Sequence, residues 1–298
     1  MSNASQYYLV FPILNKGLTL FRGPVWLINE NTNIQTITAD DLSNFTYEAD
    51  SIYNNLLSNN SRCIYITLDK NPENPIDIIK SYSSILKFTF NSYTDKNPII
   101  ISFAGLFRSN RKTKLVSVYD LESDTNYYNL KKLGYRVKTK ITKDEISKYF
   151  SIVYKVCSKN KSLIITLEKF NSARTRTMLF DKILDLSTSL ESLIPSQTEV
   201  TFKFSLYNSF FAFDEPEKRK EAYKLLHDLY ELRSKIIHGV PPTDTDNKLV
   251  NIKDNLDEYY KITLKAINYR IYYESLDLNK TWDEHIKSLI IGTESKVI

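Results

Sequence analysis

Residues 215–239 read EPEKRKEAYKLLHDLYELRSKIIHG, and this stretch decides the character of the C-terminal half of the chain. Gly239 and the two prolines that follow it mark the end of a helix, because Gly adopts the left-handed terminal conformation and Pro cannot continue the helix. The stretch therefore predicts one long amphipathic helix over residues 215–238. At 100° per residue its large apolar side chains fall mostly in one wide arc: Tyr223, Leu225, Leu226, Leu229, Tyr230, Leu232, Ile236 and Ile237.

One charged side chain, that of Arg233, projects into the middle of this apolar arc. A guanidinium cannot lose its charge, so its burial demands a partner. On a second predicted helix, residues 178–194, Glu191 also falls inside the apolar arc, whereas Asp181 and Asp185 face outward. We therefore expect an ion pair between Arg233 and Glu191, which in bidentate form would hold the guanidinium in a fixed pose.

His238 is the last residue of the helix predicted over 215–238. The final carbonyl groups of a helix carry partial negative charge, which favours an imidazolium. Arg233 and His238 lie about 140° apart in projection, so they do not share one face of an ideal helix. They meet at one site only if Arg233 reaches around the helix or if a second subunit supplies the other residue. Spacing alone leaves His238 as either a helix-terminal residue or a catalyst.

The composition excludes several classes of enzyme. The chain has 298 residues, with 6 Gly, 2 Cys and 3 His. The glycines lie too far apart for a phosphate-cradling loop, and two cysteines without a nearby His cannot build a four-ligand zinc site. We expect no metal and no cofactor. Besides His238 the histidines are His227, expected on the surface of its helix, and His285, expected to be exposed.

The chain reads as a cytoplasmic protein. Its N-terminus shows no signal peptide, and no apolar run approaches the ~20 residues of a membrane span. Two thiols without a disulfide framework fit a reducing cytosol. At 42% hydrophobic and 25% charged the composition is that of an ordinary globular protein with a substantial core.

The hydrophobic pattern of the sequence changes near residue 141, which predicts two domains and an α+β fold class overall. Residues 1–141 have short β-branched and aromatic runs, typical of a mixed α/β domain. Residues 142–298 begin with a capping box, Thr142 to Glu145, and continue with long helical patterns, which predict an all-α domain. The expected strands are residues 7–14, 25–29, 63–68, 98–103 and 114–119, with helices over 41–58 and 75–90. The expected C-terminal helices are residues 143–158, 162–172, 178–194, 198–213, 215–238, 249–276 and 282–291.

Basic residues concentrate in the N-terminal half. Residues 1–140 carry 16 basic and 12 acidic side chains, and the rest of the chain has 24 against 23. One interpretation is a pair of solvated hairpins or loops. The other is a contact surface for a polyanion such as RNA, because clustered cations gain affinity by counterion release. The candidate RNA-binding residues are Arg108, Arg111, Lys112 and Lys114, followed in sequence by Lys131, Lys132, Arg136, Lys138 and Lys140.

Three stretches resemble one family. Residues 229–239, LYELRSKIIHG, are similar to the Arg-Ser-x-x-x-His-Gly signature of the HEPN superfamily, in particular the ApeA-like HEPN family. Residues 167–174, LEKFNSAR, resemble a helix end of that family. Residues 181–193, DKILDL through LESL, resemble its next helix, with Ile183 in place of the first Leu of that pattern. The resemblance covers about residues 145–290, and the N-terminal half resembles no family.

The resemblance implies a helical bundle that dimerises and brings two Arg–His motifs around one cleft. It implies a metal-independent endoribonuclease in which Arg233 and His238 are catalytic, with Ser234 and Glu191 in support. Ser234 follows the arginine where other HEPN families have Asn, Asp or His, and this removes one polar helper. By this resemblance the substrate is RNA, cleaved by attack of the ribose 2′-OH in antiviral defence or growth arrest.

Two further interpretations stay open. The first is a non-catalytic module that binds RNA or a nucleotide, with the N-terminal half in a sensing or regulatory role. Its partners would then include a regulatory protein or a nucleotide, and no membrane. The second is a scaffold whose helices serve only for assembly.

Overall fold

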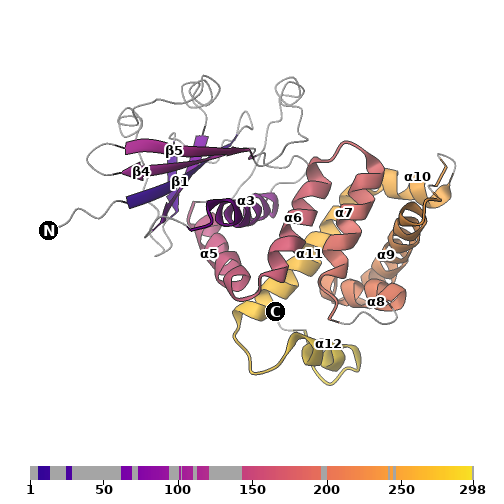
Figure 1. The fold of residues 1–298 in the computed structure, drawn as a ribbon. Coiled ribbons are helices and arrows are strands. Elements are labelled where there is room, and N and C mark those ends of the chain that lie inside the picture. Colours follow the sequence, from indigo (N-terminus) through magenta and orange to yellow (C-terminus); the bar gives the residue numbers. More distant parts are fainter. Residues whose placement is uncertain are drawn as a thin grey trace. The chain divides into compact units, whose positions relative to one another are not determined.

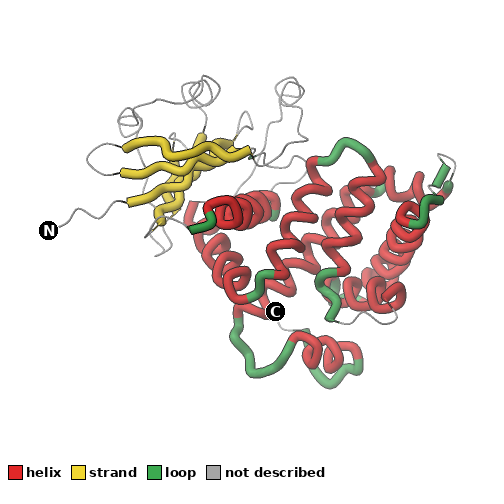
Figure 2. Tube along the Cα trace, in the orientation of Figure 1, coloured by secondary structure: helices red, strands yellow, loops and turns green. Residues whose placement is uncertain are grey.

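The chain divides into two compact units, Met1–Ser151 and Ile152–Ile298, in the computed structural model. The division falls inside helix α5 (Lys143–Lys159), whereas the predicted boundary after residue 141 precedes that helix. Each unit is described by itself (Figures 1 and 2). The structure describes residues 6–13, 25–28, 62–68, 73–93, 101, 103–109, 113–120, 143–195, 200–240, 242–243 and 246–296.

The first unit holds a five-stranded sheet in the order β2-β3-β1-β4-β5. Three pairings, β1 with β3, β1 with β4 and β4 with β5, are antiparallel, and β2 with β3 is parallel. Leu9 and Phe11 alternate along β1 and are fully buried, as expected for a strand with one face in the core. The strands are β1 (Gln6–Ile13), β2 (Val25–Ile28), β3 (Arg62–Leu68), β4 (Phe103–Ser109) and β5 (Thr113–Asp120).

One helix of this unit, α3 (Pro75–Asn91), precedes α5 among the described residues. It begins with Pro at its first turn, where the missing N–H costs nothing. Most of its length is buried, and its Phe88 contacts Tyr149 of α5, whose ring also meets Tyr93 edge to face. The helix predicted over 75–90 is therefore confirmed, and the helix predicted over 41–58 lies outside the described residues.

The predicted fold class, α+β with a mixed α/β N-terminal domain, is wrong. The described part of the chain is predominantly helical, and its strands do not alternate with helices as α/β units require. The physical reason is the pairing, because antiparallel neighbours need no helical crossover between them. The positions of most strands agree with the prediction, but β4 begins where the run 98–103 was expected to end. Gly105 and Arg108 weaken the strand signal within β4 itself.

The second unit is helical. Helix α8 packs against α9 and α11, and α7 contacts α6, α9 and α11 (Figure 1). The buried faces repeat every three or four residues, as in Leu226, Leu229 and Leu232 of α9, which are all fully buried. The helices are α6 (Ser162–Thr175), α7 (Leu179–Glu191), α8 (Val200–Ala212), α9 (Pro216–Ile237), α10 (Asn247–Asp254), α11 (Leu256–Ser275) and α12 (Trp282–Ile290).

The single helix predicted over 249–276 is in fact two, α10 and α11, which meet at Asn255. The backbone of Asn255 leaves the helical region, with φ of −112°, and its side-chain amide donates to the carbonyl of Asn251. Asn competes for local hydrogen bonds in this way, which favours helix ends over helix interiors. Among the described residues, no helix is both long enough and apolar enough to cross a membrane.

Candidate active site at the end of helix α9

Helix α9 ends at Ile237, and a turn follows in which His238 is the C-cap residue. The N–H of Gly239 donates to the carbonyl of Ile236, and the N–H of Val240 donates to that of Lys235 at 2.9 Å. These two bonds form a Schellman motif, which satisfies carbonyl groups at the helix end. Gly239 has φ of +72°, a conformation that other residues adopt at a cost. The predicted helix end at His238 and Gly239 is confirmed.

The predicted ion pair between Arg233 and Glu191 is also confirmed. An Nη of Arg233 on α9 donates to Oε2 of Glu191 at the end of α7, at 3.1 Å. One contact forms rather than the bidentate pair, and both side chains keep about a quarter of their surface exposed, 24% and 22%. Burial raises the pKa of the Glu191 carboxyl, while the charge of Arg233 and its hydrogen bond act in the opposite direction.

The guanidinium of Arg233 has a second neighbour and spare donors. It lies 5.5 Å from the ring centre of Tyr230, one turn earlier on α9, within range of a cation–π contact. Its Nε is buried without a hydrogen-bond partner. Arg233 is therefore anchored by Glu191 and Tyr230, and about a quarter of its side chain stays exposed to an anionic ligand.

His238 has a different environment from Arg233. It is exposed, and among the described residues no hydrogen bond or ion pair involves its ring. Among the described residues no hydrogen bond or ion pair joins Arg233 to His238, which agrees with their divergence in projection. Ser234 is half-buried, and its main-chain carbonyl accepts the N–H of His238 at 3.1 Å.

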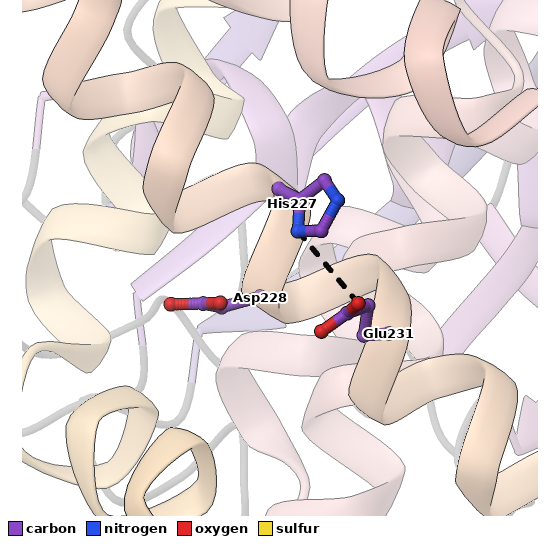
Figure 3. A group of neighbouring side chains, drawn as sticks. All are labelled: His227, Asp228 and Glu231. Carbon is purple, nitrogen blue, oxygen red and sulfur yellow. Dashed lines mark ion pairs between the residues drawn. The ribbon is translucent and has the colours of Figure 1, made fainter.

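A third polar group on α9 lies further from the helix end. Figure 3 shows the side chains of His227, Asp228 and Glu231, whose potential ligand atoms lie within 4.8 Å of one another. Nδ1 of His227 is 4.0 Å from Glu231. Lys248 of α10 forms ion pairs with both Asp228 and Glu231, so one ammonium already lies against both carboxylates and offsets one of their two charges. These side chains are better explained as an ion-pair contact that joins α9 to α10 than as a metal site.

The predicted RNA-binding cations are only partly described. Arg108 and Lys114 are paired in the backbone register of β4 and β5. Arg111 and Lys112 lie outside the described residues. The proposed polyanion surface therefore stays a prediction.

Two charged or titratable residues were placed wrongly from the sequence. Asp185 was expected to face outward, but its side chain is 9% exposed and accepts from Lys169 and Arg176, both at 3.1 Å. His285 was expected to be exposed, but it is buried. A helical projection treats outward positions as solvent, whereas α6 covers Asp185 and the aromatic rings of α11 cover His285. Three basic residues near Asp185, at positions 169, 174 and 176, were the available signal for a buried carboxylate.

The surroundings of His285 satisfy both ring nitrogens. Its Nε2 lies 2.6 Å from the hydroxyl of Tyr269, and its Nδ1 lies 3.4 Å from Glu294. The ring stacks on Tyr273 with centres 4.2 Å apart, and Trp282 lies beside it. Burial lowers the pKa of His285, while Glu294 acts to raise it.

Cys157 is buried, and burial raises the pKa of its thiol to about 12. It is therefore no nucleophile at neutral pH. Of the three histidines, His238 is the one whose ring is exposed and without an ionic or hydrogen-bonding partner among the described residues. Comparison of the chain with protein-family models, with curated proteins and with solved structures finds no match.

Proposed function

We propose that this protein is a metal-independent endoribonuclease of the cytoplasm, active in antiviral defence or growth arrest, with Arg233 and His238 as its catalytic residues. The observation that carries the proposal is the end of α9. There an exposed His238 ring follows an Arg233 guanidinium that Glu191 holds at 3.1 Å while its Nε lacks a partner. An anchored cation and a solvent-accessible imidazole are the two groups that RNA transesterification needs.

The reaction needs no oxidant and no metal. The ribose 2′-oxygen attacks the adjacent phosphorus as it loses its proton to a base, and the bond to the 5′-oxygen breaks. The leaving oxygen takes a proton from an acid, and the products are a 2′,3′-cyclic phosphate and a 5′-hydroxyl. Imidazole serves either step near neutral pH. Because DNA lacks the attacking hydroxyl, it is not a substrate.

The geometry favours a site that two copies of the chain share. Within one chain Arg233 contacts Glu191 and Tyr230, and His238 stands apart. A homodimer through the helical unit would let His238 of one copy act beside Arg233 of the other. His238 would serve as the general acid or the general base of that site. Arg233 would then stabilise the negative charge that develops on the phosphoryl oxygens.

One observation favours a second candidate, a non-catalytic module that binds RNA or a nucleotide. In the single chain the guanidinium of Arg233 is directed to a carboxylate, and no described residue joins it to His238. Such a module would bind RNA in a salt-dependent way and release no products. In that case the first unit, or a regulatory protein or nucleotide, would sense a signal rather than control cutting.

The deciding experiment measures cleavage of RNA and of the matched DNA in EDTA. We expect RNA cleavage that ends in a 2′,3′-cyclic phosphate, and a loss of about 10²–10⁴-fold in His238→Ala, the range for one acid–base group. His227→Ala is the matched control, since it removes another histidine of the same helix. Cleavage that requires metal, or that survives in the Arg233→Ala, His238→Ala double variant, would contradict the proposal.

A mixing experiment tests the shared site. We expect the Arg233→Ala protein and the His238→Ala protein to be inactive alone. When the two proteins are mixed, they form mixed dimers in which one of the two sites is intact. Recovery of about a quarter of the wild-type rate is expected if the two residues act across the interface, since half of the dimers are mixed and each carries one of two sites. No recovery despite subunit exchange would place both residues of a working site in one chain.

A further inference from the structure

Basic side chains from three parts of the second unit lie around the turn between α8 and α9. Arg219 comes from the first turns of α9, Lys265 from the middle of α11, and Lys296 from the segment after α12. All three reach the turn at residues 213–215. This corner lies at the opposite end of α9 from His238.

Arg219 is fixed in place. Its Nε donates to the carbonyl of Phe213 at 3.1 Å, an Nη donates to that of Asp214, and the guanidinium lies 4.4 Å from the ring centre of Phe210. Both acceptors are neutral main-chain oxygens, so these contacts do not neutralise the positive charge of Arg219. A guanidinium that is already ordered loses little side-chain entropy when it binds an anion.

The two lysines lie against aromatic faces. Nζ of Lys265 is 4.2 Å from the ring centre of Phe213, and Nζ of Lys296 is 4.7 Å from that of Tyr269. Lys296 also pairs with Asp214 at 3.4 Å, although its own side chain is only 15% exposed. Burial lowers the pKa of Lys296, and the charges of Lys265 and Arg219 lower it further while Asp214 raises it.

The carboxylates at the turn do not neutralise these cations. Asp214 faces Lys296, and Glu215 pairs with Lys218 at 2.8 Å. The cations around the turn are Lys218, Arg219, Lys265 and Lys296, against the carboxylates of Asp214, Glu215 and Glu217. Asp214 is 61% exposed, so it can turn into solvent when another anion takes its place.

Helix α9 adds to the positive potential. Its N-cap residue, Glu215, makes no side-chain hydrogen bond to the first turn, and Pro216 follows it. The main-chain N–H groups of Glu217 and Lys218 therefore remain available as donors, at the positive end of a 22-residue helix. Phosphate groups favour such a place, although the carboxylate of Glu217 in the same turn opposes them.

We propose that this corner is a phosphate-binding site, occupied by the backbone phosphates of single-stranded RNA. An ordered guanidinium and two ammonium groups match the charge and the several acceptor oxygens of a phosphate. A helix of this length spans about 30 Å, so an RNA of several nucleotides would reach from the corner toward His238. The assignment to RNA rests on the proposed function, whereas binding of phosphate does not.

The first experiment is calorimetric titration of the full chain with inorganic phosphate, with chloride adjusted to hold the ionic strength constant. We expect saturable binding that weakens about tenfold or more in Lys265→Glu, which loses one charge-assisted contact and adds a repulsive charge. Lys261→Glu, one turn earlier on the same helix and likewise exposed, is the matched control and should bind as the wild type does. Arg219→Gln is a second variant that removes a charge without adding one.

The second experiment measures fluorescence anisotropy of a labelled 12-nucleotide RNA. We expect Lys265→Glu to weaken binding about tenfold and to lower the dependence on salt, while the control variant Lys261→Glu binds as the wild type does. Absence of phosphate binding in the folded wild type would overturn the site. Phosphate binding with unchanged RNA affinity in Lys265→Glu would overturn the RNA assignment and indicate a small phosphorylated ligand. Phosphate binding in a protein that cuts no RNA would refute the proposed function and keep the site.

Discussion

The two helices that carry His238 and His285 end in the same way but place their histidines in opposite environments. The C-cap residue of α9 is followed by Gly239, with φ of +72°, and that of α12 by Gly292, with φ of +73°. In both, the residue after the glycine donates back to a carbonyl five positions earlier, from Val240 to Lys235 and from Thr293 to Ser288. The shared helix end therefore does not decide what either histidine does.

The surroundings of the two rings make the difference. His285 sits three residues into the first turn of α12, where Tyr269, Tyr273 and Trp282 enclose it and Glu294 accepts from its outer edge. His238 is the C-cap residue of α9, directly after the helix, and it is exposed. A histidine with both nitrogens engaged stabilises the fold, and one with free nitrogens is available for proton transfer.

Removal of the two rings provides the largest test of this contrast. We expect His285→Ala to lower the free energy of unfolding by about 3 kcal/mol, since it leaves a cavity and an unpaired Tyr269 hydroxyl. His238→Ala should change it by about 0.5 kcal/mol or less, as exposed substitutions do. Urea unfolding followed by tryptophan fluorescence and circular dichroism measures both values.

His227→Ala serves as the intermediate control. Its ring is half-buried and lies 4.0 Å from Glu231, so its loss should cost little more than that of His238. Equal unfolding midpoints for His285→Ala and His238→Ala would show that the aromatic enclosure of His285 contributes nothing to stability.

The acid side of the pH–stability curve provides a second test. Burial lowers the pKa of His285 in the folded chain, so the unfolded chain binds the extra proton more readily. Its contribution to stability is therefore complete above the unfolded pKa of about 6.5, and it is lost as the pH falls toward the folded value. Unfolding midpoints measured from pH 7.5 down to pH 5 should fall less steeply in His285→Phe than in the wild type.

The charged groups near His285 set the controls for this slope. Glu294 contacts the ring and Lys280 lies close to both, so Lys280→Gln should alter the slope without removing it. A slope in His285→Phe as steep as in the wild type would assign the acid sensitivity to carboxylates elsewhere.

The sequence predicted helices best where a pattern and an end signal coincide. The apolar arc of residues 215–238 and Gly239 together located α9 to within a residue or two at either end. The run 249–276 had the arc but no visible stop, and the break at Asn255 was missed because Asn ends helices less consistently than Gly or Pro. The fold class failed because short apolar runs indicate strands without indicating how the strands pair.

The residues of the candidate site were likewise predicted only where the pattern of a single helix carries a clear signal. Arg233 and Glu191 were found because each is a charge inside an apolar arc, and such a charge requires a partner. Asp185 and His285 were missed because each lies on an outward arc that a neighbouring helix or a later segment covers. A projection of one helix contains no information about what packs on its polar side.

The smallest test uses the two glycines themselves. A Cβ added at Gly239 or at Gly292 would meet no atom within 4 Å, so each Gly→Ala variant bears only the cost of the left-handed backbone. That cost is about 1 kcal/mol at either position, and the two melting curves should shift by similar amounts. The rate of RNA cleavage should distinguish the two variants, because relaxation at Gly239 reorients the adjacent His238 ring, while relaxation at Gly292 reaches neither Arg233 nor His238.

A matched loss of stability with a loss of activity in Gly239→Ala alone would assign the chemistry to the end of α9. Equal activity in the two variants would show that the orientation of His238 is not set by the turn that follows it.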